Sequence, residues 1–349
     1  MKSKAVVAGP EMPPLPNRWL ITGGCGFIGS VLTRELARRG VRQMRILDDL
    51  SRGSIDSLDS AKVRVHQGSS HDLEWLDGID VVIGAVENRS EVDRVMVGAE
   101  VIVHLAANAG VVQSMDDPLR DMEVNVSGSV TVLDSARRAG ASRVVLASSA
   151  AAVGAAEPPV SEDSLPRPST PYGAGKLATE AYAGAFFQAF GLEAVPLRFG
   201  NVYGPYSQAK DSVVARFIRQ WKGGETWVLY GDGEQTRDFV YIFDLIDAVI
   251  RAAVMPGVGG KVFQIATNRE TSINELAVVL ADAIEVRGFS RPSFQHGPPR
   301  AGDVRRNYSD TSLAGELLGW QAATPLKEGL GATVDWFLDP CFDEGGPIQ

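Results

Sequence analysis

From Arg18 onward, short apolar runs alternate with longer amphipathic stretches. The apolar runs are WLIT, MRILDD, IDVVIG, VIVHLA, RVVLASS and AVPLRF, and the first of them is followed by the helical stretch SVLTRELARRG. Strands that alternate with helices are typical of a sheet whose strands run parallel and are joined by crossover helices. The pattern therefore predicts an α/β fold built on a doubly wound parallel sheet.

The rhythm blurs after Phe199, where glycine and proline become denser. We therefore expect two domains, one formed by residues 18–198 plus about 240–268 and a smaller one formed by 199–239 plus about 269–340. The run VFQIA at 262–266 is expected to return to the main sheet. We interpret residues 1–17 as a loose leader, 53–78 as a helix-poor connection or insertion, and 341–349 as a tail.

Charge and cysteine content exclude several classes of protein. A formal net charge of −9 disfavours binding to nucleic acid or to a membrane surface, because both need a basic face. Cys25 and Cys341 form neither a disulfide framework nor a metal pair. No metal site is expected from the four histidines, which lack ligand spacing: His66, His71, His104 and His296. No apolar run is long enough for a membrane span or signal core, so we expect a cytoplasmic protein.

A glycine-rich turn lies between the first apolar run and the first helical stretch. In TGGCGFIGS, Gly23, Gly26 and Gly29 have the spacing GxxGxxG. Such glycines permit a tight turn, let a pyrophosphate approach the backbone, and let helix and strand pack closely. Asp48 ends the next apolar run, where a carboxylate accepts hydrogen bonds from a ribose and repels a 2′-phosphate. The turn therefore predicts a dinucleotide site that favours NAD, with NADP left open by the nearby Arg52.

Two further segments carry side chains suited to proton transfer. Tyr172 and Lys176 in YGAGK are four residues apart and therefore share one face of a helix. An ammonium and a cationic nicotinamide ring would favour the phenolate, which makes tyrosine a usable general base. Ser148 and Ser149 end the run RVVLASS, where ligands of a parallel sheet bind. Taken alone, the Tyr–Lys pair could serve only a structural role, and the two serines could cap a turn.

Together these motifs resemble the extended short-chain dehydrogenase/reductase family, and most closely its NAD-dependent sugar-nucleotide epimerases and dehydratases. The likeness covers about residues 18–340, through TGGCGFIGS, HLAA, VNVSGSVTVLDSARRAG, LASS, YGAGK, RFGNVYGP and YGDGEQTRDFVY. It implies a Rossmann-type domain and a C-terminal domain that binds the sugar nucleotide. It also implies that Tyr172 is the base, that Lys176 binds the nicotinamide ribose and lowers the pKa of Tyr172, and that Ser149 is their hydrogen-bonding partner.

The resemblance implies two sets of contacts. The cofactor set is Gly23, Gly26, Phe27, Ile28, Gly29, Asp48, Ala85, Val86, Leu105, Ala106, Ala107, Asn125, Ser148, Tyr172, Lys176 and Phe199. The substrate set is Ser149, Asn201, Val213, Arg237, Arg300, Asp303 and Asn307. Within the substrate set, Asn201, Arg237 and Arg300 would bind the diphosphate or nucleotide, and Asp303 would bind the nucleoside ribose. On physical grounds alone, the two arginines would more often be surface ion-pair partners.

The residues after Ser149 discriminate among the reactions of the family. Dehydratases carry an acidic pair there, and UDP-glucuronate decarboxylases keep a glutamate at the second position, whereas this chain has Ala150 and Ala151. C4 epimerisation through a 4-keto sugar, with tightly bound NAD regenerated in each cycle, is the reaction that remains. An oxidoreductase, a dehydratase or decarboxylase, and a non-enzymatic nucleotide-binding protein are the alternatives.

Other positions depart from the family pattern or leave the substrate open. Gly200 and Val153 replace commoner aromatic residues. By spacing alone, Ala85 occupies the position of the residue that contacts adenine, and residues 68–72 are a second alignment for that position. Asn307, intermediate in size, allows UDP-glucose, UDP-glucuronate or an acetamido sugar. A uronic acid would need a cation, for which Lys210, Arg305 and Arg306 are candidates that more often face solvent. The resemblance also implies a homodimer through the helix of Tyr172 and one near 116–138.

Overall fold

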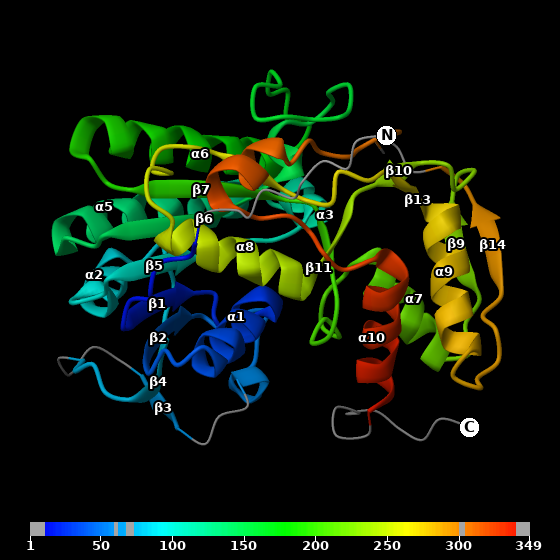
Figure 1. The fold of residues 1–349 in the computed structure, drawn as a ribbon, viewed down its shortest axis with the longest axis horizontal. Helices are drawn as coiled ribbons and strands as arrows, with labels where there is room; N and C mark the ends of the chain where they lie inside the picture. Colours follow the sequence, from blue (N-terminus) through cyan, green and yellow to red (C-terminus); the bar gives the residue numbers. More distant parts are fainter. Residues whose placement is uncertain (1–10, 59–61, 68–72, 300–303, 340–349) are drawn as a thin grey trace.

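The computed structural model describes residues 11–58, 62–67, 73–299 and 304–339 (Figure 1). Its centre is an eight-stranded parallel sheet with the strand order β12-β7-β6-β5-β1-β2-β4-β3. The strands are β1 (Arg18–Thr22), β2 (Gln43–Asp48), β3 (Val63–His66), β4 (Gly78–Ile83), β5 (Val101–His104), β6 (Arg143–Ser149), β7 (Ala194–Phe199) and β12 (Phe263–Ile265). This sheet confirms the predicted doubly wound α/β fold, and the run at 262–266 does return to it.

Helices cover both faces of the sheet, as Figure 1 shows. On one face lie α1 (Phe27–Arg38) and α8 (Ile242–Val254), and on the other α2 (Arg89–Met96), α5 (Ser129–Ala139) and α6 (Pro171–Phe190). Successive residues of a strand point to opposite faces, so Trp19 and Ile21 join one core while Leu20 joins the other. The near-continuous apolar runs in the sequence follow from this burial on both sides.

The segment 53–78 contains an element that the sequence did not predict. Besides a 3₁₀ turn at Ile55–Leu58, it supplies β3, which pairs with β4 at the edge of the sheet. This strand has four residues, and its polar Arg64 and His66 both contact Asp80 of β4. A strand so short and so polar gives little periodic signal.

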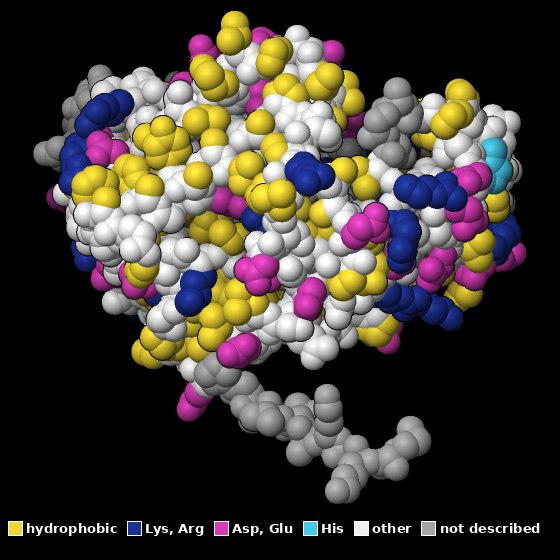
Figure 2. Space-filling view, turned by 90° about the horizontal axis from the view of Figure 1, so that it is seen from above, with side chains coloured by type: hydrophobic (Ala, Val, Ile, Leu, Met, Phe, Trp, Pro, Cys, Tyr) yellow, Lys and Arg dark blue, Asp and Glu magenta, His cyan; other side chains and the backbone are white. Residues whose placement is uncertain are grey.

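The second unit lies beside the large sheet and is built from small pieces (Figure 1). Its helices are α7 (Val213–Lys222), α9 (Ile273–Glu285) and α10 (Leu326–Leu338). Three two-stranded sheets accompany them: β8 (Asn201–Tyr203) with β11 (Phe239–Tyr241), β9 (Trp227–Tyr230) with β14 (Phe294–Gly297), and β10 (Thr236–Arg237) with β13 (Thr271–Ser272). In Figure 2, charged side chains gather over the part that holds β9, β14 and α9.

The remaining elements connect these units. Between β5 and α5 lie α3 (Val111–Asp116), α4 (Pro118–Met122) and a π-helical turn at Glu123–Gly128. A 3₁₀ turn at Ala150–Ala152 follows β6, and a second π-helical turn spans Ala314–Leu318. Residues 11–17 have no regular structure, but Met12 and Leu15 pack against the core. No helix within the described ranges combines the length and apolarity that crossing a membrane requires.

Candidate active site

The predicted cofactor residues come together at one edge of the large sheet. Parallel strands have their carboxyl ends at the same edge, and a ligand of such a sheet binds there. The residues follow or end six neighbouring strands: Gly23 after β1, Asp48 in β2, Ala85 and Val86 after β4, Leu105, Ala106 and Ala107 after β5, Ser148 and Ser149 in β6, and Phe199 in β7. The register places Ser149 directly beside Phe199.

The three glycines of the turn after β1 have different surroundings. Gly23 has a φ of +71°, and a Cβ there would lie 2.6 Å from the backbone nitrogen of Ala106. A Cβ on Gly29 would lie 2.3 Å from the carbonyl oxygen of Gly23, so helix α1 can approach the turn only with glycine at this position. A Cβ on Gly26 would have a single neighbour, that same oxygen at 3.3 Å, so the space beside Gly26 is open.

Helix α1 begins at Phe27, directly after Gly26, and no side chain caps it. Its first backbone N–H groups are therefore free to bind an anion, and the helix dipole favours negative charge there. An open cradle at Gly26 in front of this helix start fits the pyrophosphate of a dinucleotide.

Asp48 is held in a fixed orientation at the end of β2. One carboxylate oxygen accepts a hydrogen bond from the backbone N–H of Cys25 at 2.9 Å, and the other accepts one from Leu50, also at 2.9 Å. Burial raises the pKa of Asp48, while these two backbone hydrogen bonds lower it. The carboxylate thus lies against the glycine turn, as a ribose acceptor must. Arg52 is exposed in the following loop.

Asn125 lies in the π-helical turn and organises the loop after β5. Its side-chain oxygen accepts from the backbone N–H of Asn108 at 3.0 Å, and its amide nitrogen donates to the Asn108 carbonyl and to Asp121 Oδ1, the latter at 2.8 Å. The Asn125 amide is therefore engaged within the protein. Through it the structure fixes the loop that carries Leu105, Ala106 and Ala107.

Tyr172 and Lys176 lie at the start of α6. Thr170 caps this helix by accepting from the backbone N–H of Gly173 at 3.1 Å, and Pro171 fits the first helical position. The Lys176 ammonium lies 5.8 Å from the centre of the Tyr172 ring, as their spacing of four residues predicts. Helix α6 packs against β6 and the turn after it, and a side-chain hydrogen bond with Ser149 lowers the pKa of Tyr172.

The close approach of α6 to the turn after β6 depends on small residues. A Cβ on Gly173 would lie only 2.4 Å from the carbonyl oxygen of Ala151. Ser149 Oγ accepts a hydrogen bond from the backbone N–H of Ala151 at 3.2 Å, which fixes the hydroxyl at the start of this turn. The turn itself consists of Ala150, Ala151 and Ala152, of which Ala152 is fully buried.

The pKa of Tyr172 differs from the expectation. Burial raises the pKa of Tyr172 to about 12, the hydrogen bond with Ser149 lowers it, and the charge of Asp121 raises it. Burial also lowers the pKa of Lys176 to about 8, and Asp121 opposes this change. The protein groups alone therefore do not bring the phenol toward neutrality, because desolvation of the phenolate outweighs their stabilising contacts.

Apart from Ser149 in β6, the predicted substrate residues that the structure describes lie on the second unit. Asn201 has an exposed side chain at the start of β8, and its backbone N–H donates to the carbonyl of Asp238, directly after Arg237. Arg237 donates to the carbonyl of Val304 at 2.7 Å. Val213 begins α7, and the backbone N–H of Asn307 donates to Thr236 Oγ1 at 3.3 Å. Arg300 and Asp303 lie outside the described residues.

A cavity of about 470 Å³ opens beside these residues. It is lined by Tyr230, Gly231, Asp232, Gln235, Gly297, Pro299 and Arg305. An aromatic ring, backbone groups, an amide and a guanidinium are the groups that hold a planar, polar ligand.

Among the three cations considered as partners of a uronic acid, Lys210 differs from the expectation, because it is only partly exposed to solvent. Its Nζ donates to the Val202 carbonyl at 2.9 Å and lies 5.1 Å from the centre of the Phe27 ring in the glycine turn. Burial lowers the pKa of Lys210 to about 8. Arg305 and Arg306 are exposed surface residues, as expected, and pair with Asp232 and Glu270 respectively.

Sequence reasoning missed two acids near Ser148, Tyr172 and Lys176. Glu180 is buried on α6, accepts from Ser148 Oγ at 2.5 Å and forms a bidentate ion pair with Arg198 of β7. Its position, four residues after Lys176, places it on the same helix face, so spacing could have found it. Asp121 gave no such signal, because the chain around it is irregular.

The comparisons with known proteins agree with this arrangement. Residues 19–266 match the model of the NAD dependent epimerase/dehydratase family. The chain is 38% identical over 326 residues to the UDP-glucose 4-epimerase of Mycolicibacterium smegmatis, covering 92% of this chain and 98% of the relative. It is 30% identical over 344 residues to the UDP-N-acetyl-alpha-D-glucosaminuronate decarboxylase of Bacillus cytotoxicus, covering 93% and 99%.

A comparison with solved structures agrees with the match to this family. The crystal structure of UDP-glucose 4-epimerase from Thermotoga maritima with UDP-glucose superposes with a TM-score of 0.80 at 32% identity, covering 92% of this chain and 98% of that one. Similar relatives thus include enzymes of more than one reaction type. Their common ground is the family, and this chain belongs to the NAD-dependent epimerase/dehydratase family.

Proposed function

We propose that the protein is a UDP-sugar 4-epimerase that works through a transient 4-keto sugar with tightly bound NAD. The observation that carries this proposal is the pairing of Tyr172 with Ser149 beside a turn made only of alanines. One proton-transfer residue suffices to remove and return the proton of a 4-hydroxyl. Elimination of a C6 hydroxyl requires a further acid and base, and the decarboxylases that the chain resembles keep a glutamate in this segment. Ala150 and Ala151 supply neither.

Each residue has a role in this reaction. Tyr172 takes the proton of the sugar 4-hydroxyl, and Ser149 donates a hydrogen bond that holds the reacting oxygens in line. Lys176 binds the nicotinamide ribose. Bound NAD would supply the hydride chemistry at C4, and its oxidised ring would supply positive charge that favours the Tyr172 phenolate.

The open cradle at Gly26, the α1 start and the anchored Asp48 would hold the dinucleotide. The cavity of about 470 Å³ would take the nucleoside, and Arg237 and Asn201 would bind the diphosphate. The roles that the resemblance implies for Arg300 and Asp303 stay predictions. Binding concentrated on the nucleotide leaves the sugar free to turn between the two half-reactions.

The alternatives have less support. A dehydratase or decarboxylase would need an acid or base where the alanine turn lies. An oxidoreductase that stops at the ketone would consume added NAD or NADH, and a non-enzymatic nucleotide-binding protein would not need the Tyr172–Ser149 pair.

A homodimer through α5 and α6 is part of the proposal. Outward-facing positions of α6 form a stripe of small residues, namely Ala174, Ala178, Ala181 and Ala185, which lets a second helix approach closely. Between α5 and α6 is a hollow of about 260 Å³, lined by Arg89, Val130, Thr131, Asp134 and Phe186.

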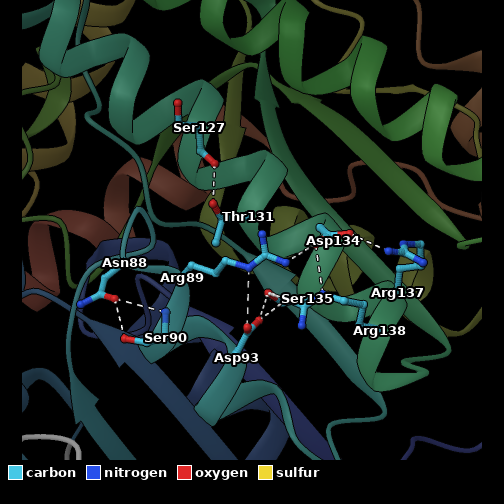
Figure 3. Close-up of polar contacts among 10 residues, drawn as sticks. All are labelled: Asn88, Arg89, Ser90, Asp93, Ser127, Thr131, Asp134, Ser135, Arg137 and Arg138. Carbon is cyan, nitrogen blue, oxygen red and sulfur yellow. Dashed lines mark hydrogen bonds and ion pairs between the residues drawn. The ribbon is translucent and has the colours of Figure 1, made fainter.

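The charged groups beside this hollow are already paired within the chain. Figure 3 shows Arg89 of α2 reaching Asp134 on α5, and Arg138 and Ser135 both pointing to Asp93. Because these charges have partners, a second copy could cover the face without leaving an unpaired charge.

The direct test is proton NMR of the purified protein with UDP-glucose, UDP-glucuronate and UDP-N-acetylglucosamine in separate tubes, without added NAD. We expect the anomeric signal of the galacto epimer with at least one of the first two. No conversion in any tube after NAD is supplied would overturn the proposal, and a 4-keto-6-deoxy product or released CO₂ would establish an alternative.

A variant of Lys210 tests, within this proposal, whether the substrate is a uronic acid or a neutral sugar. If it contacts the carboxylate of a uronic acid, Lys210→Met should lower kcat/KM for UDP-glucuronate by about tenfold more than for UDP-glucose, since a charge-assisted hydrogen bond contributes about 1.5–3 kcal/mol. Equal losses on both substrates would exclude a contact with the C6 carboxylate. Lys261→Met removes an exposed lysine and is the matched control.

A further inference from the structure

Three ionisable side chains are buried together behind the start of α6. Asp121 of α4 is 1% exposed, Lys176 of α6 is 3% exposed, and His104 of β5 is 2% exposed. Helix α4 packs on α6, and the Lys176 charge acts on the ring of His104. A buried charge without a partner is strongly unfavourable, so such a group depends on its neighbours for its protonation state.

The Asp121 carboxylate is oriented toward α6. Its Oδ1 accepts from Asn125 Nδ2 at 2.8 Å, and its Oδ2 would lie 3.4 Å from a Cβ on Gly175, the residue directly before Lys176. The absence of a side chain at Gly175 lets the carboxylate approach the helix at this point. Asp121 thus faces the residue pair that carries the proposed chemistry.

The charge of Asp121 acts on both members of the Tyr172–Lys176 pair. His104 does not compete for it, because burial and the Lys176 charge lower the pKa of His104 to about 3 and keep the ring neutral. Arg120 and Glu123, beside Asp121 in the sequence, are exposed, and Arg120 pairs with Glu87 and Glu123.

We infer that Asp121 is the counter-ion that keeps Lys176 protonated inside the site, and that it is a positioning residue for the Tyr172–Lys176 pair. The inference rests on the proposed function only in that Lys176 serves the reaction as an ammonium. Without the carboxylate, the desolvated amine would give up its proton at neutral pH. A neutral amine would lose a donor for the ribose and the positive charge beside Tyr172.

The test is Asp121→Asn, which keeps the side-chain shape and an oxygen that can accept from Asn125. Lys176 is observed by ¹³C NMR of protein labelled at lysine Cε, with its signal assigned by Lys176→Met. We expect the wild-type signal to titrate near pH 8 and the Asp121→Asn signal at least one pH unit lower, since removal of an anion lowers the pKa of a nearby ammonium. An unchanged midpoint would overturn the inference.

Asp116→Asn is the matched control, because it removes the same charge from an exposed position five residues away and should leave the Lys176 midpoint unchanged. Lys176→Met tests the pair from the other side: the Asp121 carboxyl, labelled at Cγ, should then titrate at higher pH than in the wild type. An unaltered Asp121 midpoint would also contradict the inference.

The pH profile of kcat separates this inference from the proposed function. If both hold, the alkaline limb of kcat moves to lower pH in Asp121→Asn together with the NMR midpoint. If the midpoint moves and the kcat profile does not, Asp121 is the counter-ion, but Lys176 is not needed as an ammonium in the reaction.

Discussion

His104, at the end of β5, has both ring nitrogens engaged in a buried network. Nδ1 lies 2.7 Å from Thr22 Oγ1, and Nε2 lies 3.0 Å from Ser129 Oγ. Ser129 donates its own hydroxyl proton to the Asn125 carbonyl, so Nε2 of His104 is the donor to Ser129 and Thr22 donates to Nδ1. A neutral ring therefore joins β1 and β5 to the start of α5.

This network makes the protein sensitive to acid. Burial lowers the pKa of His104 from 6.5 to about 3, so between these values only the unfolded chain binds the proton. Stability is therefore lost as the pH falls below about 6.5, by about 2 kcal/mol between pH 7 and pH 5 from this residue alone. Chemical denaturation at both pH values should show a smaller loss in His104→Gln than in the wild type. An equal loss would mean that His104 is not held neutral.

At the scale of elements, the start of α6 depends on its contact with the alanine turn after β6. Gly173→Ala would place a methyl group 2.4 Å from the Ala151 carbonyl, so the helix start must move away from Ser149. A displacement of about 1 Å at a proton-transfer site lowers the rate by about 100-fold. We expect kcat to fall by 10- to 100-fold in this variant, as steady-state kinetics would show.

Gly184→Ala is the control on the same helix, because nothing lies within 4 Å of a Cβ at Gly184. It should raise the free energy of unfolding by about 0.5–1 kcal/mol and leave kcat unchanged, since alanine favours a helix. If Gly173→Ala kept full activity, the tight contact between α6 and the turn would not be what positions Tyr172.

The sequence predicted elements well where burial leaves a local pattern. The runs that became β1, β2, β4, β5, β6 and β7 are buried on both faces and therefore nearly continuous in apolar residues. The edge strand β3 was missed because it is short and half polar. The helix expected near 116–138 is present, but it is divided into α4, the π-helical turn and α5. This change of period has no local signal, so the place of Asp121 could not be predicted.

The same reasoning applies to the site. Local sequence was enough to place several residues at the carboxyl ends of the strands, because they follow strand ends or helix spacing. These are the glycines, Asp48, Ser149 and the Tyr172–Lys176 pair. Lys210 is half-buried and lies over the ring of Phe27, nearly two hundred positions away in the chain. No local pattern reports such a contact. The rise in the Tyr172 pKa likewise reflects desolvation in the folded state.

At the scale of the whole molecule, the proposed dimer uses α5 and α6. These two helices lie on the face of the large sheet opposite α1 and α8. Ala185→Arg would put a long charged side chain into the small-residue stripe of α6. We expect light scattering to give the mass of two chains for the wild type and of one chain for this variant. Val278→Arg, an equally drastic change on exposed α9, should remain dimeric. A monomeric wild type, or dissociation only in Val278→Arg, would contradict the proposed interface.

The most direct test of the account follows deuterium at C4 of the sugar. UDP-glucose and UDP-glucuronate labelled with deuterium at C4 are incubated with the protein, without added NAD, and both epimers are analysed by NMR and mass spectrometry. The account predicts that the galacto product keeps deuterium at C4, because what leaves C4 returns to it within one active site. Exchange of the label with solvent, or its loss to NAD from solution with a ketone as product, would contradict a 4-epimerase that works through a transient 4-keto sugar.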